Sequence, residues 1–266
     1  IDKANYFAFK VDDIEEAHSH VNFQDLASDR AAYRLADQFD QDVLGYLSGY
    51  KQSALHGTAN AVNTTVNGSV AVSTAATNEL LASMQVDAAD FNSGTSGNSI
   101  VAVPRASGDS LNTTTAKASP LSIIARMSRK LDQQNVDTTG RWLVVDPVFA
   151  ELLQDEDSRL LNSDYGGSGL QNGLILNNVH GFKVYMSNNL PAVGNGATGA
   201  TSTGSTHFGV IVGGHSSAVA TADSINKTET YRDPDSFADI VRGMHMYGRK
   251  ILRPEALTRA IYVSGI

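Results

Sequence analysis

The chain has 266 residues, a formal net charge of −8 at pH 7 and a hydrophobic fraction of 41%. That apolar content can fill a core and excludes global disorder. The acidic balance excludes a dedicated DNA-binding protein, because tight phosphate binding needs clustered Lys and Arg. Cysteine is absent, which excludes disulfides, thiolate metal sites and a cysteine nucleophile. No apolar run approaches the ~18 residues that a membrane-spanning helix needs, so no membrane partner is expected. The first residue is Ile1 and not Met, which is compatible with a leading segment having been removed.

The N-terminal part predicts a strand followed by a long helix. Residues 6–11 (YFAFKV) are aromatic and β-branched, which favours a strand, and Asp12 and Asp13 close it. Residues 23–55 place apolar side chains at alternating three- and four-residue steps, which predicts one amphipathic helix of about 45–50 Å. An alternative for the same residues is a coiled-coil arm.

Residues 57–119 are rich in Ser, Thr, Asn and Gly. Short alternating runs at 66–72 and 100–103 predict strands, and residues 78–84 predict a helical turn. The three Asn-X-Ser/Thr triplets of this stretch follow from its composition, so glycosylation is not expected. We interpret the stretch as a loop-rich insertion.

The middle of the chain alternates helix and strand. Pro120 begins an amphipathic helix, and residues 141–145 (RWLVV) form a buried type of strand. Asp146 and Pro147 are expected to cap and begin a short helix.

Strands are predicted next at residues 181–186 and 207–212, separated by a small-residue tract, 193–206, that we expect to be a surface loop. Residues 216–225 predict a small-residue helix. Strand-like segments then surround the turn at residues 232–235, and residues 256–263 add a last strand. Sheet at both ends of a chain with central helices implies an α+β fold, with a discontinuous β-rich region around a central α/β region.

No arrangement of residues predicts an active site, a cofactor site or a metal site. Of the histidines only His18 and His20 are close in sequence, and two ligands are too few for a metal centre. Residues 166–169 lack the spacing of a nucleophile elbow. The strand-to-turn segment 212–217 contains two glycines but lacks the Lys-Ser/Thr ending of a P-loop. Adjacent carboxylates such as Asp12 and Asp13 point to opposite faces of a strand, which does not favour acid/base chemistry.

Four stretches, in this order, resemble the major capsid protein of tailed bacteriophages, which has the Hong Kong 97 capsid fold. They are residues 6–44 (YFAFKVDDIEEAHSHVNFQDLASDRAAYRLADQFDQDVL), 140–155 (GRWLVVDPVFAELLQD), 177–191 (NNVHGFKVYMSNNLP) and 229–257 (ETYRDPDSFADIVRGMHMYGRKILRPEAL). Together they cover roughly half of the chain. The usual N-terminal arm and the outgoing half of the extended loop have no counterpart here, residues 57–119 match no motif, and no covalent crosslink is implied.

The resemblance implies a domain organisation with a long spine helix, a discontinuous β-rich peripheral domain and a central α/β axial domain. The implied parts are residues 1–20 as the end of the extended loop and its returning strand, 21–56 as the spine helix, 57–119 as an insertion with peripheral strands, 120–226 as the axial domain and 227–266 as the strands that complete the peripheral domain.

The function that the resemblance implies is self-assembly, as hexamers and pentamers, into the icosahedral shell of a virion. The shell would enclose double-stranded DNA without binding it specifically, because an acidic wall repels phosphate. Portal, scaffolding or decoration proteins are the further partners expected, and the host cytoplasm is the expected place of assembly. Candidate subunit-interface residues are Tyr6, Phe7, Phe9, Asp12, Asp13, Arg30, Arg34, Arg232, Asp233, Asp235, Arg242, Arg249 and Arg253.

Three alternatives remain open from the sequence. One is an encapsulin-like shell of the same fold that encloses a cargo protein. Another is a phage tail or adhesion protein that binds host sugars through the Ser/Thr/Asn-rich insertion. The third is an enzyme built on the turn at Gly213 and Gly214.

Overall fold

The chain divides into two compact units, each made of segments that are distant in the sequence. One combines residues Ile1–Asp40 with Val219–Lys250, and the other combines Gln41–Ala218 with Ile251–Ile266. The computed structural model describes residues 1, 3–12, 23–49, 63–65, 69–71, 80–86, 88–91, 100–103, 118–154, 179–193 and 206–265.

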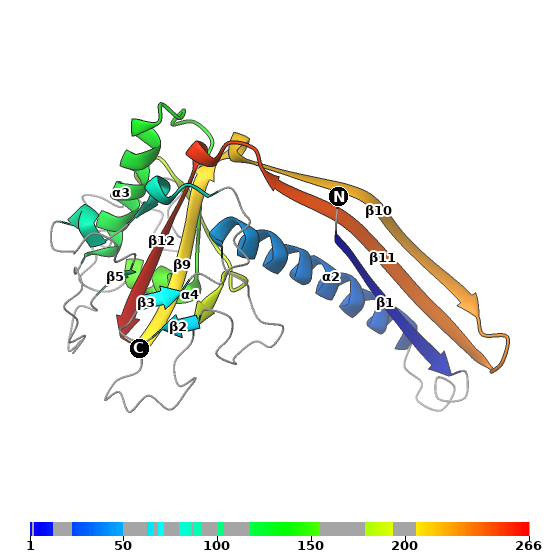
Figure 1. Cartoon of the computed structure of the whole chain (residues 1–266). Coiled ribbons are helices and arrows are strands. Elements are labelled where there is room, and N and C mark those ends of the chain that lie inside the picture. The colour runs from blue at the N-terminus through cyan, green and yellow to red at the C-terminus, as the bar shows by residue number, and fades with distance from the viewer. Residues whose placement is uncertain are drawn as a thin grey trace, which may run out of the picture. The chain divides into compact units, whose positions relative to one another are not determined.

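The first unit contains a three-stranded sheet with the strand order β1-β11-β10 (Figure 1). Its strands are β1 (Lys3–Asp12), β10 (Val219–Arg232) and β11 (Ala238–Ile251). β1 runs antiparallel to β11, with Lys3 opposite Tyr247 and Asp12 opposite Ala238. Half-buried and exposed residues alternate strictly along β1, as a strand with one covered face requires. The predicted strand at residues 6–11 is therefore confirmed.

Helix α2 (Phe23–Ser48) begins where the periodicity predicted, and its first part belongs to the same unit as this sheet. The ring of Phe39 contacts the rings of His245 and Tyr247, at centroid distances of 5.6 and 4.8 Å. The helix ends at Ser48 because Gly49 adopts a φ of 78°, a conformation that terminates helices. The prediction of a single helix as far as Leu55 is therefore wrong.

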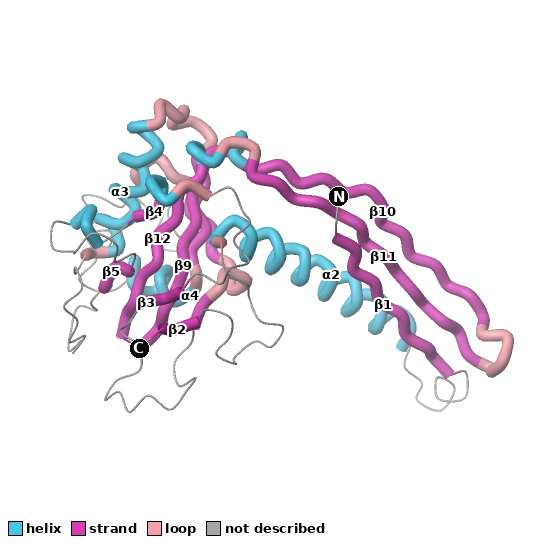
Figure 2. Tube along the Cα trace, in the orientation of Figure 1, coloured by secondary structure: helices cyan, strands magenta, loops and turns pink. Residues whose placement is uncertain are grey.

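The segment predicted as a small-residue helix at 216–225 is also different. Ser216–Ala218 form one 3₁₀ turn, and the chain then continues as the long strand β10. The hairpin of β10 and β11 is plain in Figure 2. Alanine and serine in this segment suggested a helix, whereas pairing with β11 decides its conformation, because tertiary context overrides weak local preference.

The second unit is built on a mixed sheet of seven described strands, ordered β4-β12-β9-β6-β7, with β5 beside β12 and β8 beside β9. β12 runs antiparallel to β9, from the pair Leu257 and Gly214 to the pair Gly265 and Thr206. It does not join β10 and β11, so the last of the strands predicted within residues 227–266 lies in a different sheet from the other two. The strands are β4 (Gln85–Val86), β5 (Ile100–Ala102), β6 (Arg141–Val145), β7 (Lys183–Met186), β8 (Ala192–Val193), β9 (Thr206–His215) and β12 (Leu257–Gly265). A separate two-stranded sheet pairs β2 (Asn63–Thr65) with β3 (Ser69–Ala71).

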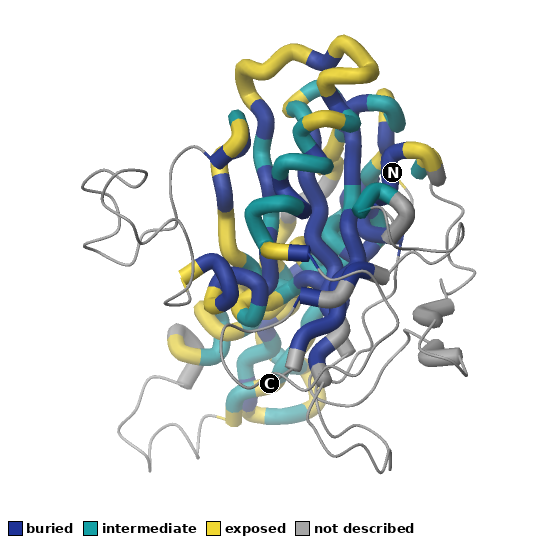
Figure 3. Tube along the Cα trace, turned by 90° about the vertical axis from the view of Figure 1, so that its left-hand side faces the viewer, coloured by how far each residue is buried: buried dark blue, intermediate teal, exposed yellow. Residues whose placement is uncertain are grey.

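Two helices cover the core of the second unit. Helix α3 (Pro120–Gln133) begins as predicted, because the Oγ of Ser119 accepts from the N–H of Ser122 and Pro120 occupies the first helical position. It packs against β12 and against helix α4 (Pro147–Leu153). The buried side chains of α3 recur at helical spacing: Ile123, Ile124, Met127 and Leu131. In Figure 3 the buried residues follow the strands and the covered faces of the helices.

Candidate functional site

The sheet of the first unit separates the aromatic candidates of β1 onto two faces. Tyr6 is 81% exposed, whereas Phe7 and Phe9 are half-buried on the other face, with ring centroids 6.0 Å apart. Phe7 lies directly opposite Gly243, and a Cβ on Gly243 would come within 2.4 Å of the phenyl ring. The ring of Phe7 thus fills the space left by the missing side chain. Phe7 and Phe9 serve the packing of the sheet, and Tyr6 is the aromatic side chain of β1 that a neighbour can reach.

The face that carries Tyr6 mixes apolar side chains with charges. Met244, the residue opposite Tyr6, is 37% exposed, and Tyr231 of β10 is 43% exposed. The guanidinium of Arg242 lies 5.1 Å from the centroid of the Tyr231 ring and donates to Oε2 of Glu229 at 2.7 Å. This face therefore offers apolar contact area beside ordered charges.

Glu229 is the centre of these charges. Lys227, two residues earlier on β10, also binds its carboxylate. The hydrogen bonds from Lys227 and Arg242 lower the pKa of Glu229 from 4.5 to about 2. The carboxylate is consequently ionised throughout the physiological pH range.

The turn between β10 and β11 is closed by Asp233. Its carboxylate accepts from Nζ of Lys10 at 2.5 Å, from Oγ of Ser236 at 2.8 Å and from the N–H of Asp235 at 3.1 Å. These hydrogen bonds, with Lys10 as the largest contributor, lower the pKa of Asp233 to about 2. Phe237 follows at the tip and is 78% exposed. The network fixes the backbone that presents this phenyl ring to solvent.

The remaining candidates are dispersed. Arg34 lies 3.5 Å from Asp37, Arg232 lies 3.8 Å from Asp239, and Arg253 lies 3.0 Å from Glu255. Exposed pairs of this kind contribute little to folding, because solvent screens them. Their places are as follows: Arg30 and Arg34 on α2, Asp12 at the end of β1, Arg249 half-buried on β11, Asp235 in the turn, Arg253 in the second unit, and Asp13 outside the described residues.

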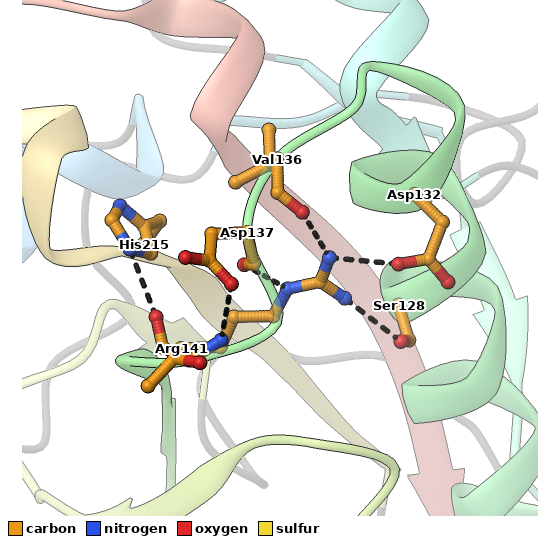
Figure 4. A network of polar contacts seen from close by, with 7 residues as sticks. Ser128, Asp132, Val136, Asp137, Arg141 and His215 are labelled. Atoms are coloured by element: carbon orange, nitrogen blue, oxygen red, sulfur yellow. Dashed lines mark hydrogen bonds and ion pairs between the residues drawn. The ribbon is translucent and has the colours of Figure 1, made fainter.

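A buried arginine organises the connection between α3 and β6 (Figure 4). Arg141 is 1% exposed, and its guanidinium donates to the backbone carbonyls of Val136 and Asp137, at 2.6 and 2.8 Å. It also binds the carboxylate of Asp132 at 2.7 Å and Oγ of Ser128 at 3.2 Å. Two bonds go to the last turns of α3 and two to the connection that follows it, so the arginine is a structural brace between them.

His215 fastens the end of β9 to the same connection. Its Nε2 lies 2.9 Å from the carbonyl oxygen of Thr139, which can only accept, so this nitrogen donates. Its Nδ1 accepts from the N–H of Ser217 at 3.2 Å. The imidazole is therefore the Nε2–H tautomer in a structural role. Gly213 and Gly214, predicted to lead into a turn, instead lie within strand β9, which ends at His215. The hydrogen bond from the N–H of Thr139 lowers the pKa of Asp137, the neighbouring carboxylate.

A second buried cluster was missed by the sequence analysis. Asp146 is 2% exposed and occupies the N-cap position of α4, but its side chain makes no capping hydrogen bond. Its carboxylate instead accepts from the hydroxyl of Tyr262 at 2.7 Å and contacts Nε2 of His207 at 2.7 Å. Burial raises the pKa of Tyr262 far above 10.0. All three side chains are buried, so the cluster joins β6, β9 and β12 and presents no reactive group to a substrate.

The described residues contain no group of three His, Asp or Glu side chains placed to hold a metal ion. In that part of the chain, no helix is both long and apolar enough to cross a membrane.

Comparisons with known proteins show the class of protein that carries these surfaces. A model of the phage capsid protein family matches residues 85–260. The chain belongs to the phage capsid protein family. No curated protein matches the sequence.

Solved capsid structures share the fold over nearly the whole chain. A protein of Mycobacterium phage Che8 is 24% identical with a TM-score of 0.61, and the match covers 98% of this chain and 70% of that one. The capsid of cyanophage P-SCSP1u gives 17% identity and a TM-score of 0.60, covering 99% and 72%. The capsid of Ralstonia phage GP4 gives 12% identity and a TM-score of 0.61, covering 99% and 73%.

The predicted α+β fold of the Hong Kong 97 type and the predicted family are thus confirmed. The chain is a structural major capsid protein of tailed phages. It assembles with copies of itself into a shell, and its location is the capsid of the virion.

Proposed function

We propose that the shell is icosahedral, that this chain builds it as hexamers and pentamers, and that it encloses double-stranded DNA after assembly in the cytoplasm of the bacterial host. The observation that carries the proposal is the exposed face around Tyr6 in a chain of the phage capsid family. An 81% exposed tyrosine beside the exposed Met244 and Tyr231 does not stabilise the fold of an isolated subunit. A contiguous surface of this kind is typical of a contact with another protein.

The two compact units correspond to two roles in this proposal. The unit with the three-stranded sheet and the first part of α2 is the peripheral domain, and the unit built on β12 and β9 is the axial domain. Residues 251–266 then belong to the axial domain. The spine helix is α2, as the resemblance implied.

The contacts between subunits are many and individually modest. We assign Tyr6, Arg232, Asp235 and Arg242 to them, with Asp12, Asp13, Arg30, Arg34, Asp233, Arg249 and Arg253 as further candidates. Interfaces on the order of 1,000 Å² supply apolar burial at roughly 25 cal/mol per Å². A closed shell becomes durable because every subunit makes several such contacts at once.

The contents of the shell are held without specific binding. The net charge of −8 makes the wall repel phosphate. The protein has no enzymatic role in this proposal, and its other partners are portal, scaffolding or decoration proteins.

Electron microscopy of the expressed full-length protein tests the proposal. We expect closed shells, or rosettes with five- and six-fold symmetry. Fibres would favour the adhesion protein, and a concentrated monomer would contradict assembly. Particles from infected cells that hold cargo protein instead of nuclease-protected DNA would favour the encapsulin-like alternative.

A further inference from the structure

Strand β10 forms one edge of the three-stranded sheet, and among the described residues it pairs with β11 alone (Figure 2). It is 14 residues long and contains no proline. Its described side chains are exposed from Ala220 to Ser224 and again at Lys227, Thr228 and Thr230. A long, regular edge of this kind is a template for pairing with another strand, and proteins that avoid such pairing interrupt the edge.

We propose that the edges of β10 from two copies of this chain pair antiparallel across a twofold axis, with Thr228 opposite Thr228. The inference rests on the proposed self-assembly and names one contact within it. The strand that pairs with this edge is β10 of a second copy of the chain.

The charges of β10 select this register. In antiparallel pairing, opposite residues share one face of the sheet. A twofold axis therefore passes through a residue pair, and centring it on Thr228 places Lys227 of each copy opposite Glu229 of the other. Opposite charges at facing positions stabilise a sheet, and identical threonines form a favourable pair.

The neighbouring registers are disfavoured by the same residues. Centring the axis on position 227 sets Lys227 against Lys227, and centring it on position 229 sets Glu229 against Glu229. Like charges directly opposite each other destabilise a strand pair. Because Glu229 already binds Lys227 and Arg242 within its own subunit, the second copy brings its Lys227 to a carboxylate that is held in place.

The extent of the pairing also agrees with the structure. The register reaches from Ser224 to Arg232, which is the last residue of β10. One step further, Asp223 would face Asp233, whose carboxylate is bound to Lys10 in the turn. The strand thus ends before two acidic residues would be placed opposite each other.

The absence of cysteine from the chain permits a direct test. A Thr228→Cys variant of the full-length protein places two thiols at facing positions, about 4.5–5.5 Å apart between Cα atoms, a separation that a disulfide can bridge. The matched control is Thr230→Cys, the same exchange on the same strand and face. In the proposed register the two copies of position 230 lie ~13 Å apart along the strands, too far for a disulfide.

After mild oxidation of assembled particles we expect disulfide-linked dimer as the major species of Thr228→Cys and only background dimer for Thr230→Cys. Particles of Thr228→Cys that form without the linked dimer, or variants that crosslink equally at both positions, would overturn the register while leaving the proposed shell intact. Failure of the wild-type protein to form particles would instead contradict the proposed function.

Hydrogen exchange gives an independent reading on the wild-type protein. We expect backbone amides of β10 to exchange more slowly in particles than in unassembled subunits, because the edge gains hydrogen bonds. Unchanged exchange would overturn the pairing. Slower exchange in a protein whose Thr228→Cys variant yields no linked dimer would show that another segment covers the edge, which also overturns it.

Discussion

The hydroxyl of Tyr262 lies 2.7 Å from both carboxylate oxygens of Asp146, although 116 residues separate them in the chain. Asp146 occupies the N-cap position of α4, yet its carboxylate binds the tyrosine and makes no capping hydrogen bond to the helix. Gly209 makes this possible, because a Cβ there would come within 2.4 Å of the Tyr262 ring. One buried contact thus joins the first turn of α4 to strand β12.

Removing the Tyr262 hydroxyl should destabilise the second unit. In Tyr262→Phe the buried carboxylate of Asp146 loses a donor, which costs about 1–3 kcal/mol of unfolding free energy. Urea denaturation of the unassembled subunit measures the change. Tyr185→Phe is the control, because Tyr185 is 55% exposed on β7, and equal stability of the two variants would contradict the role of the contact.

Replacing Arg141 should destabilise the same unit through a different connection. Arg141→Met leaves the carbonyls of Val136 and Asp137 without their buried donor, and we expect a loss of roughly 2–5 kcal/mol. Thermal unfolding followed by circular dichroism reports it. The control Arg129→Met breaks a more exposed pair with Asp90 and should cost no more than about 1 kcal/mol; a similar cost for both would refute the brace.

The packing of Phe7 over Gly243 predicts non-additive effects in the first unit. Gly243→Ala forces the phenyl ring to move and should cost about 1–3 kcal/mol. In a Phe7→Leu background the smaller side chain leaves room, so the same exchange should cost less. Double-mutant unfolding measurements give the coupling, and strictly additive costs would show that the ring does not occupy this space.

Lys10 should control the titration of Asp233. The pKa of Asp233 is about 2 in the folded chain, below its ordinary value near 3.9. Because the folded value is depressed, the contribution of this carboxylate is complete above about pH 4 and is lost as the pH falls through about 2. Lys10→Met should raise the pKa of Asp233, measured by carboxyl-carbon NMR of the unassembled subunit. An unchanged midpoint would assign the depression to Ser236 and the Asp235 amide alone, which Ser236→Ala can check.

Charge reversal at Arg232 should affect assembly more than folding. The guanidinium lies 3.8 Å from Asp239, and both side chains are largely exposed, so folding stability should change by less than about 1 kcal/mol. If Arg232 contacts a neighbour, Arg232→Glu reduces the yield of particles and their resistance to salt. Light scattering measures both, with Lys183→Glu as an exposed control. Unaltered assembly would remove Arg232 from the interface.

The sequence predicted those helices and strands whose ends and faces are set by residues close together in the chain. Ser119 and Pro120 marked the start of α3, and the aromatic, β-branched run at residues 6–11 marked β1, because capping and alternation act within a few residues. The strand β10 was predicted as a helix at its start, since its conformation depends on pairing with β11. The sequence likewise did not predict that β12 pairs with β9, because that pairing also joins segments distant in the chain.

The candidate surface was predicted in part. An alternating strand shows that Tyr6 and Phe7 lie on opposite faces, but the sequence alone does not say which face is covered. The partners of Asp146 could not be found from the chain, because Asp-Pro is an ordinary helix start and its tyrosine lies far away. An arginine opening the apolar run RWLVV was the available sign of a buried guanidinium at Arg141.

The position of β12 has a consequence for biosynthesis. Its partners β4, β5 and β9 all leave the ribosome earlier, and β4 must wait for more than 160 further residues to be translated before Ala260 reaches its neighbour Val86. Such non-local pairing is slow to form. The sheet of the second unit is therefore complete only after residues 257–265 have emerged, whereas every residue of the first unit is translated earlier.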